Sequence, residues 1–354
     1  MKTFTSNTTL KDSEDYKGYG YKKPLPKTFP ISRALTSTIA KAGNTIPTLF
    51  PELNTGAEGI VVTGDRKLTD YTFYALCYGF SRALFNQSYQ KGNKANEGIS
   101  KTDDEKLQAI SKRIGEELYS GNIKITLSEL CYLSFGHKPD TKEREKVKTM
   151  LELLDTEKIG LDLIWADKIP EADKTTKLKR RLIAIWDEEI KGNGEIDYSI
   201  TLHPYFSYNI TSSYGLVPQD FATRLSQVEK KKDERYYKLL FFLSKNIRGK
   251  EVKYYKSDIL DLLDMRDTYK KDKTRTENTL HKYFDNLVKI GYLEKWAIAE
   301  TEIIRNKESI TRYSFIVCSN FDKMVVPSAE KGFCKQLITN ILSLKKIAYN
   351  IYNN

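Results

Sequence analysis

Apolar and polar positions repeat most regularly between residues 273 and 293, where they predict a long helix. Apolar side chains recur there at intervals of three and four, which places them on one helix face: Leu280, Tyr283, Phe284, Leu287 and Val288. Thr274 and Glu277 have the spacing of a capping box, in which two side chains satisfy backbone N–H groups at a helix start. Gly291 follows the last apolar turn, where a glycine commonly ends a helix.

Smaller elements are predicted on both sides of this helix. In chain order they are a short helix from 218, a helix at 236–245, a strand at 251–255, a helix at 257–265, a basic turn at 266–273 and, after the long helix, strands at 292–303 and 311–317 around a charged tip at 305–308. Helix, strand, helix, turn, helix and hairpin is the order of a winged helix, a helix-turn-helix whose hairpin forms the wing.

The first half of the chain is predicted to follow the same order. Its elements are helices at 69–87 and 102–119, a strand at 123–127, a short helix from 128 to Gly136, a longer helix from 141 to Gly160, and strands at 161–165 and 179–186 around a charged tip. Gly192 and Gly194 then form a turn into an alternating strand at 195–206. The two halves share this order without visible sequence identity, so the repeat is architectural.

These elements predict an α+β fold that is mainly helical and holds two tandem winged-helix domains. We expect the first domain at residues 67–215 and the second at residues 216–326. Residues 1–66 are expected to be an irregular basic N-terminal arm, because Tyr, Lys, Thr and Gly dominate them. Residues 327–354 are expected to form a basic amphipathic C-terminal helix.

The charge of the chain favours a polyanionic partner. Its 354 residues include 58 Lys and Arg against 47 Asp and Glu, a formal net charge of +11. Residues 216–330 carry 23 basic against 18 acidic side chains, and residues 331–354 carry four against none. Most of the excess therefore lies in the second half, with the long helix. A lysine-rich surface without such a partner is about as common, so the charge alone does not decide the function.

Cysteine and histidine are too scattered for a disulfide framework or a metal site. The four cysteines stand at positions 77, 131, 318 and 334, without a CxxC pair. The N-terminus has no apolar segment typical of a signal peptide, and no segment approaches about 18 apolar residues. We therefore expect reduced thiols, no metal, no membrane partner and a soluble, cytoplasmic protein.

None of the common catalytic constellations is complete. A phosphate-binding loop ending at Gly249 and Lys250 would need a glycine at position 244, which is a serine. Nucleases of the His-x-His type need two histidines on one strand, whereas the three histidines of this chain stand alone at positions 137, 203 and 281. We expect no catalytic residue, no enzymatic activity and no cofactor.

The polar face of the long helix carries donors suited to DNA. In a helix-turn-helix, the second helix enters the major groove with its N-terminal side chains at the base edges. Arg matches guanine and Asn matches adenine, so Arg275 and Asn278 are the expected base contacts. The other candidates lie in the turn, on the helix and at the wing tip: Lys270, Lys271, Lys273, Thr274, His281, Lys282, Arg305 and Lys307. The alternative is a solvated face with ordinary lysines.

The corresponding helix of the first half, at 142–154, alternates Lys, Glu and Arg, so its exposed face is nearly neutral. That composition argues against base reading and suits a protein–protein surface or weak phosphate contacts. The N-terminal arm is either a mobile segment or one that follows a nucleic-acid groove. The C-terminal helix could bind a partner, DNA or the core of the chain itself.

Four segments resemble the initiator (Rep) proteins of iteron-type plasmids, which are built from tandem winged helices. The segments are IDYSITLHPYF, ERYYKLLFFL, KTRTENTLHKYFDNLVKIGYLEKW and RYSFIVCS, and the resemblance covers residues 67–326. It implies binding of double-stranded DNA at origin repeats, read by Arg275, Asn278 and Lys282. It also implies a dimerisation or accessory role for residues 138–186, a homodimer in equilibrium with the monomer, and recruitment of host replication proteins.

Two further interpretations stay open. A tandem winged-helix transcriptional regulator would show the same features without a role in replication. A nucleic-acid enzyme with widely separated catalytic residues is the third interpretation, and a metal-dependent nicking assay on supercoiled DNA would detect it.

Overall fold

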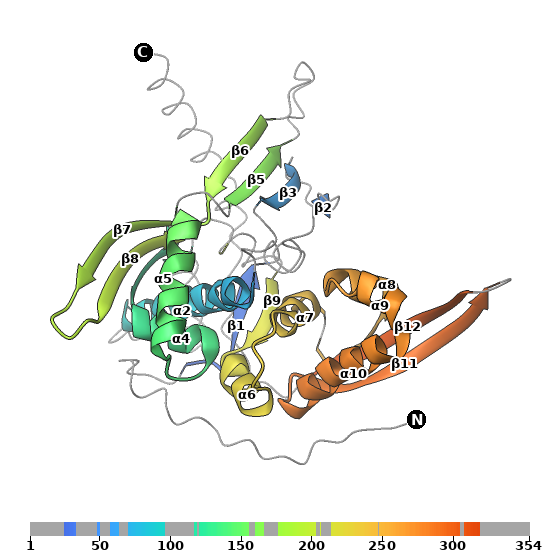
Figure 1. The fold of residues 1–354 in the computed structure, drawn as a ribbon. Helices are drawn as coiled ribbons and strands as arrows, with labels where there is room; N and C mark the ends of the chain where they lie inside the picture. The colour runs from blue at the N-terminus through green and yellow to red at the C-terminus, as the bar shows by residue number, and fades with distance from the viewer. Residues whose placement is uncertain are drawn as a thin grey trace, which may run out of the picture.

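The computed structural model combines helices with small antiparallel sheets, which confirms the predicted α+β class (Figure 1). The structure describes residues 25–32, 48–49, 57–63, 70–95, 117–118, 120–155, 160–165, 176–202, 206, 214–246, 248–304 and 308–318. Within these residues the buried apolar side chains form one continuous core. The predicted helix at 102–119 lies outside the described residues except for its end.

A first group of elements packs around helix α2 (Tyr71–Ala95), which extends beyond the helix predicted at 69–87. Residues 72–86 of α2 are all buried, so the helix is enclosed on every side. The other elements of this group are β4 (Asn122–Thr126), α4 (Leu127–Phe135), α5 (Thr141–Asp155), β7 (Ile183–Ile190) and β8 (Ile196–Leu202). The strands form an antiparallel sheet in the order β4-β8-β7.

The hairpin of this sheet differs from the predicted one. The segment expected at 161–165 is β5 (Gly160–Trp165), which pairs with β6 (Thr176–Arg181) in a separate sheet with β2 (Thr48–Leu49) and β3 (Ala57–Thr63). The strand predicted at 179–186 is divided between the end of β6 and the start of β7. The hairpin beside β4 is β7–β8 instead. Alternate side chains of β8 are buried, namely Ile196, Tyr198, Ile200 and Leu202, so this strand supplies the apolar face that the core requires.

The prediction of an irregular arm at residues 1–66 is wrong for part of that range. Strand β1 (Thr28–Ser32) is fully buried and pairs with β9 (Tyr214–Pro218). The ring of Phe29 packs edge-on against that of Tyr78, with centroids 5.4 Å apart. This segment therefore belongs to the core. Residues 1–24, like the C-terminal helix predicted at 327–354, lie outside the described residues.

A second group of elements follows α6 (Phe221–Val228). It comprises α7 (Arg235–Ser244), β10 (Glu251–Tyr255), α8 (Lys256–Leu262), α9 (Arg266–Lys271), α10 (Lys273–Lys289), β11 (Leu293–Ile304) and β12 (Glu308–Val317). The basic turn predicted at 266–273 contains the helix α9, whose sequence RDTYKK has no helix breaker. The strand order β10-β12-β11 matches the order β4-β8-β7 of the first group. In each sheet the last strand in the chain lies between the first and the second.

The two groups meet in a packed junction. The Tyr237 hydroxyl of α7 donates a hydrogen bond to the Ser134 carbonyl of α4, at 2.6 Å. Arg82 of α2 is fully buried and donates through Nε to the Gln219 side chain, which precedes α6, at 2.9 Å. Burial lowers the pKa of Arg82 to about 10, so its guanidinium stays charged at neutral pH. Buried contacts of this kind hold the two groups in one relative position.

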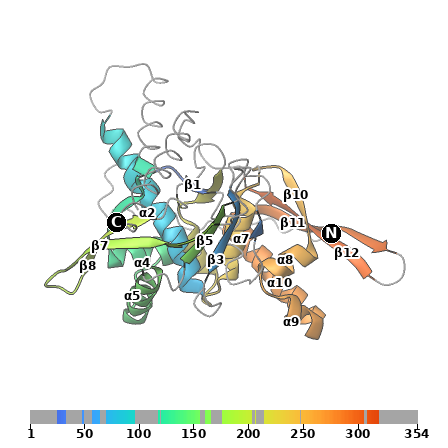
Figure 2. The same cartoon turned by 90° about the horizontal axis from the view of Figure 1, so that it is seen from above.

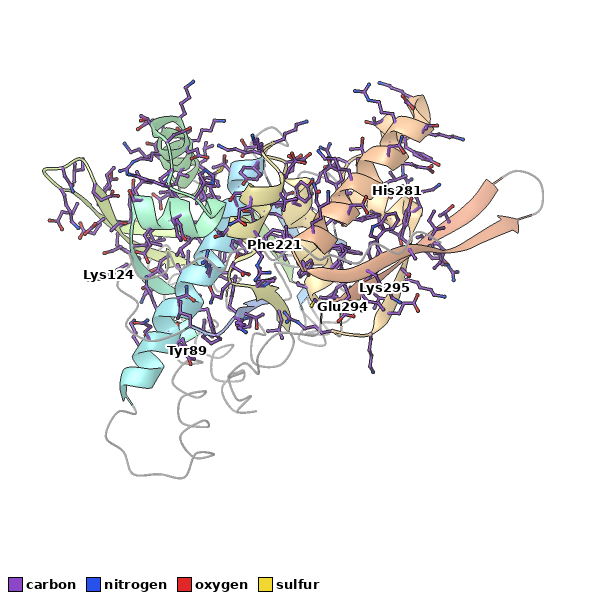
Figure 3. All side chains as sticks on the ribbon, turned by 90° about the horizontal axis from the view of Figure 1, so that it is seen from below. Tyr89, Lys124, Phe221, His281, Glu294 and Lys295 are labelled. Carbon is purple, nitrogen blue, oxygen red and sulfur yellow. The ribbon has the colours of Figure 1, made fainter. Side chains whose placement is uncertain are left out.

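Helices α5 and α10 project on the same side of the molecule. In Figure 2, α5 and the α9–α10 pair both extend toward the lower edge. Figure 3 shows the same helices at the upper edge of the opposite view. The hairpins β7–β8 and β11–β12 extend outward on opposite flanks (Figure 1). A long ligand lying across this side would meet both helices.

Candidate nucleic-acid interface

Helix α10 is capped by Asp272, and not by the threonine that the sequence suggests. The Asp272 carboxylate accepts a hydrogen bond from the backbone N–H of Arg275 at 2.9 Å, the geometry of an N-cap. The prediction of a capping box from Thr274 and Glu277 is therefore wrong. The helix begins two residues earlier than that box would place it, and Thr274 is exposed in its first turn.

The end of α10 is the predicted one. Gly291 has φ +77°, the left-handed conformation that glycine adopts without strain. Its N–H donates to the Val288 carbonyl at 2.9 Å, and the N–H of Tyr292 donates to the Leu287 carbonyl at 3.0 Å. These two bonds define a Schellman motif. The motif turns the chain back so that β11 runs along the helix that precedes it.

The apolar face of α10 packs on the β11–β12 hairpin. Leu280, Phe284 and Leu287 are fully buried. The Phe284 ring lies 4.9 Å from the Phe315 ring and 5.2 Å from the Trp296 ring, centroid to centroid. Burying side chains of this size stabilises a fold by about 1.5–3 kcal/mol each. This packing fixes the rotation of the helix, so its polar face is held toward solvent.

Four of the predicted DNA contacts line one shallow hollow on that polar face. The hollow has a volume of about 430 Å³ and is lined by Asp272, Thr274, Arg275, Asn278, Thr279 and Lys282. Arg275 and Asn278 are exposed, and among the described residues neither side chain has an ion pair or hydrogen-bond partner. Their donors are therefore available to a ligand that enters the hollow.

Lys282 also lines the hollow, but its ammonium group has a partner. It pairs with the Glu229 carboxylate at 2.7 Å. Burial acts to raise the pKa of Glu229, whereas hydrogen bonds from Lys282 and from the Lys231 backbone N–H lower it below its ordinary value. Glu229 is thus charged at neutral pH and holds Lys282 at one side of the hollow.

The lysines of α9 and of the start of α10 flank the hollow. Lys270, Lys271 and Lys273 are all exposed. Lys270 is 3.4 Å from Asp267, an exposed pair that contributes little. The N-terminus of α10 adds the positive end of the helix dipole to the same place. The start of α10 is therefore a region of positive potential.

His281 lies on the side of α10 that faces the hairpin. Its Nε2 is 3.1 Å from the Tyr313 hydroxyl, and its ring centroid is 4.8 Å from that of Trp296. Burial lowers the pKa of His281 further than the nearby Glu277 and Asp285 raise it. A half-buried imidazole that is neutral at pH 7 supports the packing of the hairpin, and its position does not favour a base or phosphate contact.

Glu277 ties α10 to the helices before it. Its carboxylate accepts hydrogen bonds from the Lys256 ammonium of α8 at 2.9 Å and from the Tyr269 hydroxyl of α9 at 3.2 Å. Burial acts to lower the pKa of Lys256, but the bonds to Tyr269 and Glu277 raise it above its ordinary value. The charged pair holds three helices together at the base of the exposed surface.

The tip of the β11–β12 hairpin carries two of the predicted contacts. Arg305 and Lys307 lie outside the described residues, which stop at Ile304 and resume at Glu308. The described parts of the paired strands extend away from the body of the molecule (Figure 1). The roles of the two residues stay predictions.

Helix α5 occupies the corresponding place in the first group, with its own polar side chains largely engaged. Asp140 and Glu143 form a reciprocal capping box, with N–H to carboxylate distances of 2.7 and 3.0 Å. Arg144 donates to the Glu195 carboxylate at 3.3 Å. Lys148 pairs with Glu145 at 3.0 Å. The capping box expected on α10 is thus found on α5, whose exposed face is nearly neutral as predicted.

Sequence reasoning missed the contribution of residues 229–234, the loop between α6 and α7. The charged run EKKKDE lies between the predicted short helix from 218 and the helix predicted at 236–245. In the structure, Lys232 forms an ion pair with Glu143 of α5, and Glu229 pairs with Lys282 of α10. Three adjacent lysines between two helices were the available signal, but nothing in their spacing predicted partners 89 residues apart in the chain.

No described helix is long and apolar enough to cross a membrane. No family model matches the sequence. No curated protein matches it either. Among solved structures, one described as "Crystal structure of Pi initiator protein in complex with iteron DNA" is similar to this chain, with a TM-score of 0.40 and 14% sequence identity over 69% of this chain and 95% of that chain. The sequence comparisons therefore place the chain in no family.

Proposed function

We propose that this protein binds double-stranded DNA sequence-specifically through two winged-helix units, the second of which reads the bases. The observation that supports this most directly is the hollow on α10, where Arg275 and Asn278 present donors that have no partner in the described part of the chain. An Arg side chain can bond guanine and an Asn side chain adenine with two hydrogen bonds each in the major groove. The exposed Lys270, Lys271 and Lys273 beside them suit the phosphates of the same duplex.

The biological role that we propose is initiation of plasmid or mobile-element replication. The chain would bind origin repeats, exchange between monomer and dimer, and recruit host replication proteins. This part rests on the sequence resemblance described above and on the repeated order of elements in the two groups. The second candidate is a tandem winged-helix transcriptional regulator, which the same α10 surface would serve equally well.

The first experiment is selection of duplexes from a random pool by the full-length chain, followed by footprinting of the selected sequence. We expect a protected site that contains guanine and adenine in the major groove positions that α10 meets. Recovery of no preferred sequence, with binding no tighter than to mixed-sequence DNA, would contradict sequence-specific recognition. Whether the selected sequence occurs as a repeat array near a replication origin separates the initiator from the regulator.

Two substitutions then test the roles on α10. Arg275→Ala should weaken binding to the selected duplex by about 1–3 kcal/mol and relax the preference at one base pair. Lys271→Ala should weaken binding to selected and mixed-sequence duplexes alike. It should also make the slope of log K against log salt shallower by the amount that about one phosphate contact contributes. If both variants bind as the parent chain does, α10 is not the reading helix.

A further inference from the structure

The loop of residues 229–234 makes contacts with both α5 and α10, the two helices that project on the same side of the molecule. On one side, the Lys232 ammonium bonds to Glu143, in the first turn of α5. On the other side, Glu229 accepts from Lys282 of α10 at 2.7 Å, and Asp233 accepts from the Tyr283 hydroxyl of α10 at 2.6 Å. The loop therefore lies between α5 and α10.

Two of the acidic groups that hold the loop, Glu143 and Asp233, are buried, so its position is well defined. Glu143 is 4% exposed and also accepts from the Asp140 N–H at 3.0 Å and lies 2.9 Å from His137 Nε2. Asp233 is 6% exposed and pairs with the guanidinium of Arg235 at 3.2 Å. Buried carboxylates stay in place because leaving their partners would strand a charge away from water.

The two central lysines of the loop are not used in holding it. Lys230 and Lys231 are exposed, and neither ammonium group has an ion pair among the described residues. The Lys231 backbone N–H donates to Glu229 at 3.1 Å, which fixes the backbone but leaves the side chain in solvent. Two cations are thus presented from a fixed backbone, between α5 and α10.

A cleft of about 720 Å³ lies beside the loop, between the start of α5 and α6. Its lining includes His137, Lys138 and Arg144. Lys138 at its rim is exposed, and the structure shows no ion pair for it within the described residues. The lining has no Asp or Glu, so the cleft extends the positive surface of the loop toward α5.

Three acidic side chains around this surface are already paired with basic groups. Glu143 pairs with Lys232, and Glu229 pairs with Lys282. Glu195, beside the cleft, pairs with Arg144 at 3.3 Å. These three carboxylates therefore do not pair with Lys138, Lys230 or Lys231, and a polyanion that lies across α10 would meet these lysines next.

We propose that Lys230 and Lys231, with Lys138 at the cleft rim, bind the phosphate backbone of the duplex that α10 reads, at a site between α10 and α5. This inference rests on the proposed function and specifies how the first group takes part in it. The contact carries no sequence information, because phosphates are the same at every step. It sets the register of the duplex on the protein and lengthens the footprint toward α5.

The test compares two double variants of the full-length chain that remove the same charge. Lys230→Ala with Lys231→Ala removes the loop contacts. Lys124→Ala with Lys295→Ala is the control, since both lysines are exposed and lie away from the edge at which α5 and α10 project (Figure 3). Binding to the selected duplex and to a mixed-sequence duplex is measured by fluorescence anisotropy over a range of salt concentrations.

We expect the loop variant to weaken binding to both duplexes by a similar factor, about tenfold at low salt, with the slope of log K against log salt shallower by about 1.8. The control should keep the parent slope to within about 0.5. The inference is overturned if the loop variant keeps the parent slope, or if the slope of the control variant becomes shallower by as much as that of the loop variant. If Arg275→Ala still lowers specific binding in that case, the proposed function stands. If Arg275→Ala changes nothing either, both fail.

Discussion

Helices α5 and α10 hold corresponding positions in the two groups of elements and project on the same side of the molecule (Figure 2), yet their surfaces differ in one respect. On α5, Arg144 is engaged by Glu195, and Lys148 by Glu145. On α10, Arg275 and Asn278 share a hollow in which their donors have no partner among the described residues. Corresponding positions in the fold therefore do not give the two helices the same polar surface.

The helix ends show a second difference between the two groups. Gly136 ends α4 and Gly291 ends α10, both with positive φ. A Cβ at Gly136 would lie 2.1 Å from the backbone N of Thr223 in α6, whereas a Cβ at Gly291 would lie 3.4 Å from the Arg224 side chain, an ordinary contact. The end of α4 thus lies against the backbone of α6, whereas the end of α10 meets α6 through the Arg224 side chain, which donates to the Ile290 carbonyl at 3.3 Å.

The largest effect is expected from alanine at the first of these glycines. Gly136→Ala should lower the free energy of unfolding by about 3–5 kcal/mol, because a methyl group must displace the α6 backbone as well as adopt a strained φ. Gly291→Ala should cost only about 1–2 kcal/mol, the cost of the left-handed conformation alone. Urea unfolding followed by circular dichroism measures both. Equal losses would mean that the α4–α6 contact is loose.

A smaller effect is expected on the reading surface, and it should appear on one helix alone. Asn278→Ala on α10 should weaken binding to the selected duplex by about 1–3 kcal/mol and relax the preference at one position. Lys146→Ala, an exposed substitution on α5, should change specific binding by less than about 0.5 kcal/mol. Titrations at a single salt concentration compare the two variants. A larger loss for Lys146→Ala would reverse the roles of the two helices.

The smallest effect concerns the link between α5 and the loop. Burial acts to raise the pKa of Glu143, but hydrogen bonds from Lys232, the Asp140 N–H and His137 lower it below its ordinary value of 4.5. Because the folded-state pKa is the lower one, the Glu143 carboxylate stabilises the fold above pH 4.5, and this stabilisation disappears as the pH falls through the folded-state pKa.

Glu143→Gln should accordingly cost about 1–2 kcal/mol at pH 7 and less at pH 4. Urea unfolding at the two pH values gives the difference, with Glu145→Gln as the matched exposed control on the same helix. A loss that stayed the same at both pH values would show that the charge of Glu143 is not what links α5 to the loop.

The regular parts of the chain could be read from the sequence. The apolar spacing of α10, the left-handed glycines after α4 and α10, and the alternating strand β8 all stand where the sequence placed them. Each is a local pattern, set by the period of a helix or strand and by the conformations that glycine allows. The nearly neutral face of α5 follows in the same way from a run of alternating charges.

The partners of these elements were decided only by the tertiary structure. β1 pairs with β9, and β5–β6 joins β2 and β3 in place of β4. Strand pairing depends on which apolar faces remain uncovered once the helices have packed, and residue spacing does not encode that. The hairpin beside β4 was therefore misassigned, because the strand predicted at 179–186 is divided between β6 and β7.

The same division runs through the candidate site. The sequence determined that one face of α10 is apolar and that the other carries donors. It did not determine that His281 turns toward Tyr313, that Asp272 caps the helix, or that Lys232 reaches Glu143. Polar side chains choose among many possible partners by distance and burial in the folded chain, so only the tertiary structure separates the donors of α10 that are engaged from those left free.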